Sequence, residues 1–326
     1  MRFQPTSDQR DFARSLDAML SAAGTPSAVR AWSAGDTGAG RALWSRLADA
    51  GVFALAAPGA YEGVGPLPVE LALACVELGR HAVPGPVVET VAATAFLTRL
   101  AELGEEGPAK RLLPSIVSGT CVASVLVPGA SPYALDADAA DVVLVATDHE
   151  VRIAPGHGPL QPSTDPARRL ARPLPGGELL ARGAQLTDAV AHAVLWARLA
   201  TAGQCVGLAE ALLSRTVAYV KQRTQFGQPI GAFQAVKHRL ADTLVAVEFA
   251  RPLLYGAALS LAPGEVAAAK VTAGEAAYAA ARTALHLHGA VGYTQELDLS
   301  LWLRKARPLR DAWGTPDDCR AQVLAG

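Results

Sequence analysis

The stretch RTQFGQPIGAFQ, from Arg223 to Gln234, separates two long segments of helix-forming residues. Its glycines and Pro229 disfavour a continuous helix, because glycine is too flexible and proline lacks an amide donor. Arg223 closes the first helix, where a cation suits the helix dipole. A guanidinium beside glutamine amides can bind a diphosphate and a flat heterocycle. A solvated polar loop is the simpler interpretation, and residue types alone favour it.

Helix-forming residues fill both ends of the chain. Four helices are expected before residue 114, and Ser7 is the expected N-cap of the first. The third, PVELALACVELGR, is apolar nearly all round, which indicates burial, and Gly79 is its expected end. The next helix, about 186–223, carries small residues that would let neighbouring helices approach closely. Further helices are expected at about 233–261, with a kink at Pro252, 265–288 and 296–311.

The middle of the chain differs in composition from both ends. TCVASVLVPG and DVVLVATDHEVRIAPG are rich in valine and bounded by Pro, Gly and Asp, which predicts strands. Residues 155–178 contain so many prolines and glycines that no regular structure is expected there. The sequence therefore predicts a mainly α protein with three domains: an N-terminal α-helical domain at 1–113, a reduced β domain at 114–185 and a C-terminal helical bundle at 186–326.

Composition excludes several classes of partner. The formal charge of the 326 residues is −1, so no overall field attracts nucleic acid or an anionic membrane. No charge-free apolar run reaches the length of about 18 residues that a membrane span needs, and the polar N-terminus predicts no signal peptide. The four cysteines follow no metal-binding spacing, which indicates a reduced, cytoplasmic setting. No metal site is predicted.

The order of residues in RTQFGQPIGAFQAVKHRLAD resembles the signature of acyl-CoA dehydrogenases, flavoproteins that introduce an α,β double bond into acyl-CoA thioesters. HLHGAVGYTQELDLSLWLRKARPLRDAWGT is similar to the C-terminal block of that family, which begins Q-x-x-G-G-x-G. LWSRLADAGVFALAAPGAYEGVG and VELGRHAVPGP resemble its N-terminal helical domain. The resemblance covers about 1–113 and 186–320. It implies the order of helical domain, middle β domain and C-terminal four-helix bundle.

The resemblance also implies an FAD site shared between subunits. Arg223 would contact the pyrophosphate, and Phe233 and Gln234 would bind the adenine half. The loop from His286 to Ala290 would meet the FAD of a neighbouring subunit, although Gly289 also suits a plain helix C-cap. The candidate cofactor residues are Arg223, Gln225, Phe226, Phe233, Gln234, His286, Leu287, His288, Gly289, Ala290 and Thr315.

The catalytic base of the family is missing. Most members place a glutamate just before the Gly-Thr of the C-terminal block, and this chain has Trp313 there. A minority place it beside an arginine on the helix before the RxQFG stretch, where this chain has Ala197 next to Arg198. An indole cannot abstract a proton from an acyl-CoA. Arg198 and Trp313 are candidate substrate-pocket residues.

Glu248 is a less favoured substitute base. It lies in an otherwise apolar helix, where burial could raise the pKa of its carboxyl group. Pairing with Arg251 or Arg239 is the competing interpretation. The β domain departs from the family as well, because it lacks the T-E-P-x-x-G-S-D stretch and has no tryptophan between Trp44 and Trp196.

Three functions are compatible with these residues. The first is a subunit without its own base that completes the FAD site of a homologous partner carrying the glutamate, as in α2β2 acyl-CoA dehydrogenases of actinobacterial sterol side-chain β-oxidation. The second is a self-sufficient acyl-CoA dehydrogenase with a non-standard base. The first two imply FAD, an acyl-CoA substrate and an electron-transfer flavoprotein or similar acceptor. The third is a non-catalytic scaffold subunit without FAD.

Overall fold

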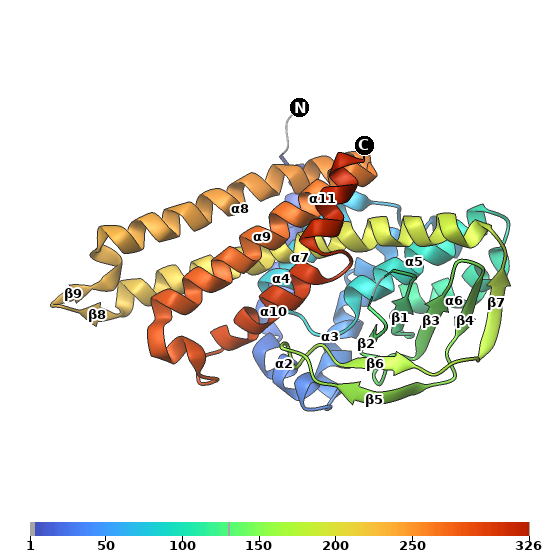
Figure 1. The fold of residues 1–326 in the computed structure, drawn as a ribbon, viewed down its shortest axis with the longest axis horizontal. Coiled ribbons are helices and arrows are strands. Elements are labelled where there is room, and N and C mark those ends of the chain that lie inside the picture. Colours follow the sequence, from blue (N-terminus) through green and yellow to red (C-terminus); the bar gives the residue numbers. More distant parts are fainter. Residues whose placement is uncertain (1–3, 130, 326) are drawn as a thin grey trace. The chain divides into compact units, whose positions relative to one another are not determined.

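The computed structural model describes residues 4–129 and 131–325, which divide into two compact units. The bundle unit comprises the residues up to Pro26, Ala72–Val83 and the residues from Thr201 onward. The sheet unit comprises Ser27–Leu71 and Pro84–Ala200. Figure 1 shows the long helices of the bundle unit and the strands of the sheet unit. The chain is mainly helical with a small β region, as predicted.

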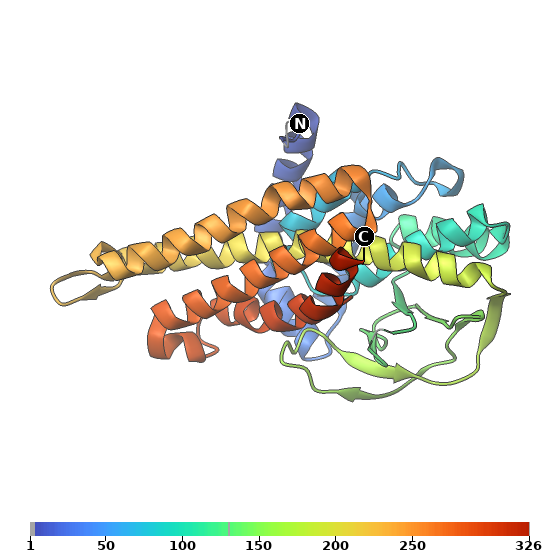
Figure 2. The ribbon, with the colours of Figure 1, turned by 45° about the horizontal axis from the view of Figure 1, so that its top comes forward.

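The bundle unit consists of helices with one short hairpin. Helices α8 and α9 pack along each other, and α10 and α11 both pack on α9 (Figure 2). Its elements are α1 (Ser7–Ala22), the second part of α4 (Pro68–Arg80), the second part of α7 (Gln185–Gln222), β8 (Thr224–Gln225), β9 (Gln228–Pro229), η3 (Ile230–Ala232), α8 (Gln234–Ser260), α9 (Pro263–His288), η4 (Gly289–Tyr293), α10 (Leu299–Asp311) and α11 (Pro316–Leu324).

Glycines let α4 and α7 touch backbone to backbone. A Cβ atom on Gly207 would lie 1.7 Å from the Val76 carbonyl oxygen, and one on Gly79 would lie 2.0 Å from the Gln204 carbonyl oxygen. The prediction of close helix approach from small residues is confirmed. Gly79 was expected to end its helix, but it lies within α4 and serves this contact instead.

Two helix starts differ from the prediction. The N-cap of α1 is Thr6, because its side chain accepts from the Gln9 amide while the Gln9 side chain accepts from the Thr6 amide. This reciprocal pair satisfies two amides at once, whereas Ser7 would satisfy one. The last predicted helix, 296–311, begins at Leu299. A further helix, α11, follows with Pro316 in its first turn.

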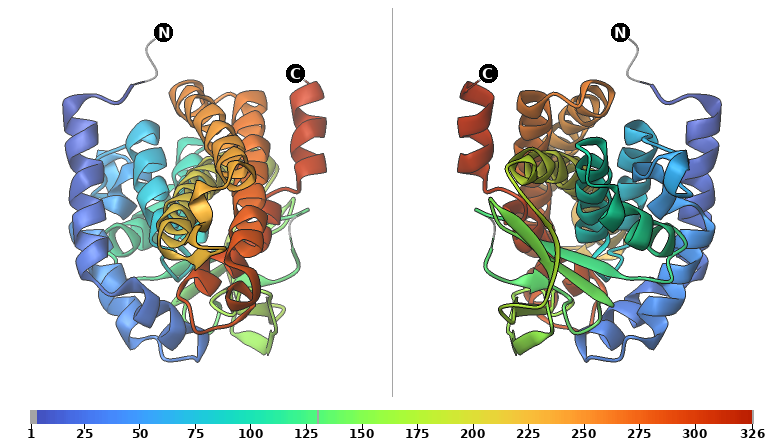
Figure 3. Two further views of the ribbon diagram at one scale, coloured as in Figure 1. Left: turned by 90° about the vertical axis from the view of Figure 1, so that its left-hand side faces the viewer. Right: turned by 90° about the vertical axis from the view of Figure 1, so that its right-hand side faces the viewer.

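The sheet unit holds two sheets and the helices that cover them. Strands β1 and β3 are parallel neighbours in a four-stranded sheet of order β1-β3-β4-β7, and β2-β6-β5 form a second, antiparallel sheet. Helix α5 packs on β1 and α6 on β7 (Figure 3). The elements are α2 (Thr25–Ser33), α3 (Gly38–Asp49), η1 (Val52–Ala56), η2 (Gly59–Tyr61), α5 (Val87–Glu102), α6 (Glu106–Val117), β1 (Ala123–Leu126), β2 (Ala134–Leu135), β3 (Val142–Ala146), β4 (Glu150–Ile153), β5 (His157–Gln161), β6 (Leu170–Pro173) and β7 (Glu178–Arg182).

The expectation of no regular structure at residues 155–178 is wrong. Strands β5 and β6 lie within this segment, and β7 begins at its end. Pro159 is accommodated because β5 is an edge strand of its sheet, where a missing amide donor breaks no ladder. Pro173 is the last residue of β6, so its missing amide donor does not interrupt the strand. The prolines and glycines of this segment suggested a loop. They are tolerated because they lie on an edge strand or at the end of a strand, and those positions depend on pairing with distant residues.

A buried carboxyl group lies in the sheet unit. Asp136 is fully buried, and its Oδ1 accepts from Trp32 Nε1 at 3.1 Å and from the Arg169 amide at 3.2 Å. Its Oδ2 has no hydrogen-bond partner among the described residues. Burial raises the pKa of Asp136 to about 7, against the opposing effect of these two hydrogen bonds. The folded protein therefore holds this proton at pH values where the unfolded chain has released it.

The free energy of unfolding that Asp136 contributes should fall as pH rises. Its folded pKa lies above its unfolded pKa, so its contribution to stability is complete below about pH 4 and is lost as pH rises toward about 7. Asp136→Asn keeps the Oδ1 acceptor and removes the titration. We expect the free energy of unfolding of the wild type relative to this variant to fall by about 2–4 kcal/mol between about pH 4 and pH 8.

Urea unfolding of both proteins across this pH range measures the difference. Asp138→Asn is the control, because Asp138 pairs with Arg169 in the same region and its replacement leaves Asp136 in place. Parallel stability curves for the wild type and Asp136→Asn would contradict a buried, protonated carboxyl group.

None of the helices in the described part of the chain is long and apolar enough to cross a membrane.

Candidate functional site

The stretch from Arg223 to Gln234 forms a tight hairpin. Strands β8 and β9 pair Gln225 with Gln228, so Phe226 and Gly227 are the two turn residues. Both have positive φ angles, 54° and 79°, which is the geometry of a two-residue hairpin that matches strand twist. Arg223 precedes β8 and is exposed, and its amide bonds the Tyr219 carbonyl at the end of α7. The hairpin therefore presents a cation and an aromatic ring at its surface.

The chain turns from this hairpin into α8. Phe233 is the N-cap of α8, and its phenyl side chain cannot accept a hydrogen bond from the first amides of the helix. Gln234 is the first helical residue and is exposed. Phe226 stands edge-on to Phe233, with ring centroids 6.2 Å apart, although Phe226 is 92% exposed. Arg223, two phenyl rings and the uncapped start of α8 thus belong to one surface segment, which suits an anion joined to a flat ring.

A pocket of about 410 Å³ lies in the bundle unit, between α8, α9 and η4. It contains His286 together with two arginines, Arg239 from α8 and Arg282 from α9. The other lining residues are Ala279, Thr283, Leu285 and Tyr293. The hairpin and η4 lie at the same end of the bundle unit in Figures 1 and 2. Two guanidiniums and an imidazole make this pocket suitable for a phosphorylated ligand.

The two pocket arginines were missed by reasoning from the sequence. Arg239 enters the sequence-based predictions only as a partner for Glu248, and Arg282 has no role in them. The signal for Arg282 was its spacing, because it lies four residues before His286 and hence on the same face of α9. Arg239 carried no comparable signal, since its approach to α9 depends on how the two helices pack.

The end of α9 contains two histidines in different environments. His286 is exposed in the pocket, whereas His288 is buried and stacked on Tyr219, with ring centroids 4.1 Å apart. His288 Nδ1 lies 2.7 Å from the Ala284 carbonyl oxygen, and burial lowers the pKa of its imidazole. The His288 ring thus packs inside the bundle unit, and the predicted contact of the loop from His286 to Ala290 with cofactor stays a prediction. Gly289, with φ 61°, caps α9, while Leu287 is half-buried and Ala290 exposed.

Trp313 occupies a turn that is anchored by a buried lysine. Helix α10 ends at Asp311, and Trp313 follows with φ 58°, a left-handed conformation unusual for a bulky residue. The buried Lys270 donates to the carbonyl oxygens of Arg310, at 2.6 Å, and Gly314, at 3.4 Å. Lys270 thereby anchors both sides of the turn. The half-buried indole offers one N–H donor and no basic atom.

The other two candidate base positions, Ala197 and Glu248, do not supply a buried carboxylate either. Ala197 is fully buried on α7 and carries no polar side-chain atom, and Arg198 beside it is half-buried in the sheet unit. The expected burial of Glu248 is wrong, because its side chain is 55% exposed and pairs with Arg251 at 3.0 Å. The competing interpretation, an ion pair with Arg251, is confirmed. Burial therefore gives no support to Glu248 as a base.

Thr315 has a structural role. Its hydroxyl accepts from the Asp318 amide, and the Asp318 carboxylate accepts from the Thr315 amide at 2.9 Å, so the two residues form the capping box of α11. The hydroxyl also donates to the Asp318 carboxylate at 2.7 Å. A cofactor contact through the same hydroxyl would compete with this cap.

Comparison with known proteins identifies the family. The N-terminal domain of acyl-CoA dehydrogenases matches residues 6–120, and the C-terminal domain of acyl-CoA dehydrogenases matches residues 187–325. The chain belongs to the acyl-CoA dehydrogenase family. The family is FAD-dependent, so the enzyme class, an oxidoreductase, agrees with the prediction from the motifs. The region between the two matches contains the seven described strands of the sheet unit.

Two relatives within the acyl-CoA dehydrogenase family match most of the chain. The acyl-CoA dehydrogenase IpdE2 of Mycobacterium tuberculosis is 34% identical over 284 residues, which cover 86% of this chain and 85% of the relative. The protein of the same name from Mycolicibacterium smegmatis is 31% identical, with 95% and 96% covered. A chain of the ChsE4-ChsE5 complex from Mycobacterium tuberculosis has a TM-score of 0.83 at 26% identity and covers 100% of this chain and 98% of that one.

Proposed function

We propose that this chain is a subunit of an FAD-dependent acyl-CoA dehydrogenase that lacks its own catalytic base. It completes the FAD site of a homologous partner that carries the glutamate, for α,β-desaturation of an acyl-CoA thioester. The observation that carries the proposal is the contrast between the two ends of the family's site. Arg223 and the arginine pocket are present, while Trp313 and Ala197 stand where the family would place a carboxylate.

The residues present fit one end of FAD. Arg223 and the pocket arginines Arg239 and Arg282 supply guanidiniums for the diphosphate, and Phe233 and Gln234 supply a ring and an amide for the adenine. When bound, FAD accepts the hydride from the substrate. No tryptophan lies between Trp44 and Trp196, so this chain's strands lack the ring that the family sets beside the flavin. The chain therefore holds the nucleotide half, and the flavin half belongs to the partner.

Proton abstraction also falls to the partner. Trp313 fills the base position with a hydrophobic ring, which excludes water and removes no proton. Glu248 is exposed and ion-paired with Arg251, so it has neither the burial nor the free carboxylate that the sequence-based hypothesis required. These features favour a base-lacking subunit over a self-sufficient enzyme with a non-standard base.

An apolar face of α8 supports assembly with another chain. Val245, Phe249 and Leu253 follow one another at four-residue spacing, and Leu244 lies beside them. All four are exposed, Phe249 to 69%. An exposed stripe of large apolar side chains on one helix face is typical of a surface that a partner covers. The structurally similar complex joins ChsE4 to ChsE5, two differently named proteins, which favours a homologous acyl-CoA dehydrogenase subunit as that partner.

Coexpression tests the proposal. The chain is produced alone and together with an acyl-CoA dehydrogenase subunit that carries the catalytic glutamate, and each preparation is examined by native mass spectrometry and flavin absorbance. We expect a heteromer that retains FAD and desaturates acyl-CoA, and no turnover from this chain alone. A homo-oligomer with flavin and turnover would instead identify a self-sufficient enzyme. Absence of flavin from every preparation would leave a scaffold.

The remaining assignments follow from this role. We place the domain limits at 1–113, 114–185 and 186–326. The electron acceptor in this role is an electron-transfer flavoprotein or a similar protein. A cytoplasmic location suits the four cysteines, which are all free and buried.

A further inference from the structure

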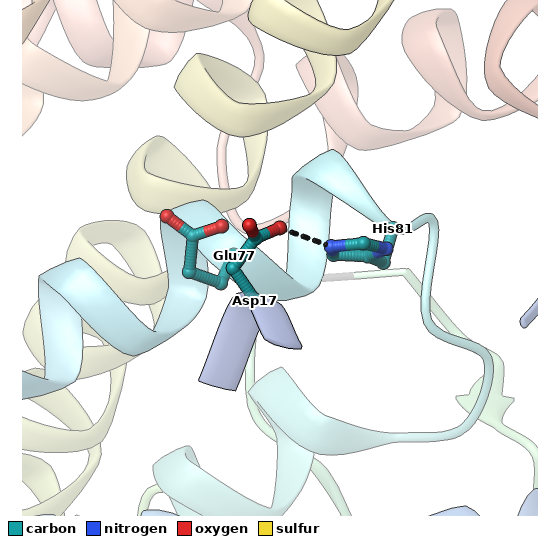
Figure 4. Close-up of side chains that lie close together, drawn as sticks. All are labelled: Asp17, Glu77 and His81. Carbon is teal, nitrogen blue, oxygen red and sulfur yellow. Dashed lines mark hydrogen bonds and ion pairs between the residues drawn. The ribbon is translucent and has the colours of Figure 1, made fainter. Parts of the chain in front are cut away.

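Three potential metal ligands converge away from the FAD residues. Asp17 comes from α1, Glu77 lies in the last turn of α4, and His81 directly follows α4 (Figure 4). One ligand atom from each side chain lies within 4.8 Å of the other two. His81 Nε2 and Asp17 Oδ1 are 2.7 Å apart. The His81 amide donates to the Glu77 carbonyl oxygen at 3.1 Å, so His81 continues the last helical turn and the two side chains share one face.

The ligand set suits zinc. One imidazole and two carboxylates match the nitrogen and oxygen donors that Zn²⁺ takes at about 2.0–2.2 Å. Ligands around a tetrahedral zinc stand about 3.4 Å apart at these bond lengths. The His81–Asp17 pair must therefore open by less than about 1 Å, on the order of a small side-chain rotation, and the Glu77 oxygen must approach by about 1.4 Å at most.

The arginine beside Glu77 leaves a ligand atom available. Arg80 Nε bonds Glu77 Oε2 at 2.8 Å, whereas the second guanidinium contact, to Oε1, is 3.5 Å long. A carboxylate has about four acceptor positions on its two oxygens, so Oε1 can take a metal while Oε2 keeps the arginine. Arg80 also pairs with Glu210, which holds the guanidinium in place.

Carboxylates outnumber guanidiniums in the ion pairs around the three ligands. Arg80 bridges Glu77 and Glu210, and Arg251 bridges Glu210 and Glu248. With Asp17, four carboxylates face two guanidiniums in this network. Glu77 is buried, so water solvates its charge poorly. A divalent cation would supply the missing charge.

We propose that Asp17, Glu77 and His81 form a zinc site that joins α1 to α4. Asp17 is half exposed, so the ion has a path of entry and water completes its coordination. All three ligands belong to the bundle unit of this chain, so the site needs no residue from a partner subunit. Its role is to tie the N-terminal helix to the bundle.

Isothermal titration of the purified full-length chain with ZnCl2 tests the site. We expect one zinc per chain and a higher Tm on zinc addition, and much weaker binding of Mg²⁺, which prefers oxygen ligands and retains its water. Asp17→Asn and His81→Asn should each weaken zinc binding by about 10-fold or more, because each removes a ligand. Asp17 is half exposed, so its variant should fold.

Matched controls separate this site from other surface groups. Asp8→Asn changes an exposed carboxylate on the same helix, and His149→Asn changes an exposed histidine in the sheet unit. Both should bind zinc as the wild type does. Failure of the wild type to bind zinc would overturn the proposal. So would binding that both ligand variants retain, because the zinc would then sit on other histidines.

Discussion

Replacing Arg223 with alanine should remove FAD from the complex of this chain with its glutamate-bearing partner. Arg223 is exposed at the end of α7, directly before the hairpin that precedes α8. A charge-assisted hydrogen bond contributes about 1.5–3 kcal/mol, so its loss should weaken FAD retention by about 10–100-fold. Flavin absorbance per complex after gel filtration measures the retained cofactor.

Lys221 provides the matched control for Arg223. It is an exposed cation in the last turn of α7, two residues earlier. Lys221→Ala removes the same charge without removing the fork of guanidinium donors, and should leave FAD retention near the wild-type value. Arg223→Lys should retain an intermediate amount, because an ammonium keeps the charge but not the bidentate geometry. Equal flavin loss from the Lys221 and Arg223 variants would mean that only general charge matters.

Replacing Gly207 with alanine should destabilise the bundle unit more than an ordinary surface substitution does. The new Cβ would lie 1.7 Å from the Val76 carbonyl oxygen and 2.7 Å from the Arg80 nitrogen, both in the backbone of α4. Neither atom can rotate away, so α4 and α7 must separate. Overpacking of this kind costs about 1–3 kcal/mol, and we expect about 3 kcal/mol because two backbones collide. Thermal unfolding followed by circular dichroism measures the loss.

Gly107→Ala is the control for Gly207. Gly107 lies in α6, and a Cβ there would meet nothing within 4 Å. Alanine is the better helix former by about 1 kcal/mol, so this variant should be neutral or slightly more stable. If Gly207→Ala unfolds at the same temperature as Gly107→Ala, the two helices are not in backbone contact, and the small residues of α7 need another explanation.

Local sequence patterns predicted several elements well. Gly227, Pro229 and Gly231 predicted the break between α7 and α8, because their backbone limits act within a few residues. Gly289 predicted the end of α9 for the same reason. The absence of a carboxylate at Trp313 was also readable, since it follows from residue identity and spacing alone. These predictions needed no knowledge of distant contacts.

Other features depended on distant residues and were missed. Strands β5 and β6 were expected to be irregular, because only their pairing with each other shows how prolines are tolerated. The burial of Glu248 was expected from its apolar neighbours in sequence, but exposure depends on which helix face packs. Arg239 and Arg282 were not assigned to a pocket because they lie on different helices.

By itself, the sequence determined the family, the helix–strand–helix order and the absence of a carboxylate at Trp313 and Ala197, because these follow from residue types at near-neighbour spacing. Only the tertiary structure decided that His288 is buried against Tyr219, that Arg239 and Arg282 join His286, and that Asp17 meets Glu77 and His81. Each of these requires two helices to pack at a particular face and register. That packing is set by side-chain volume and burial across the whole unit, which no short stretch of sequence contains.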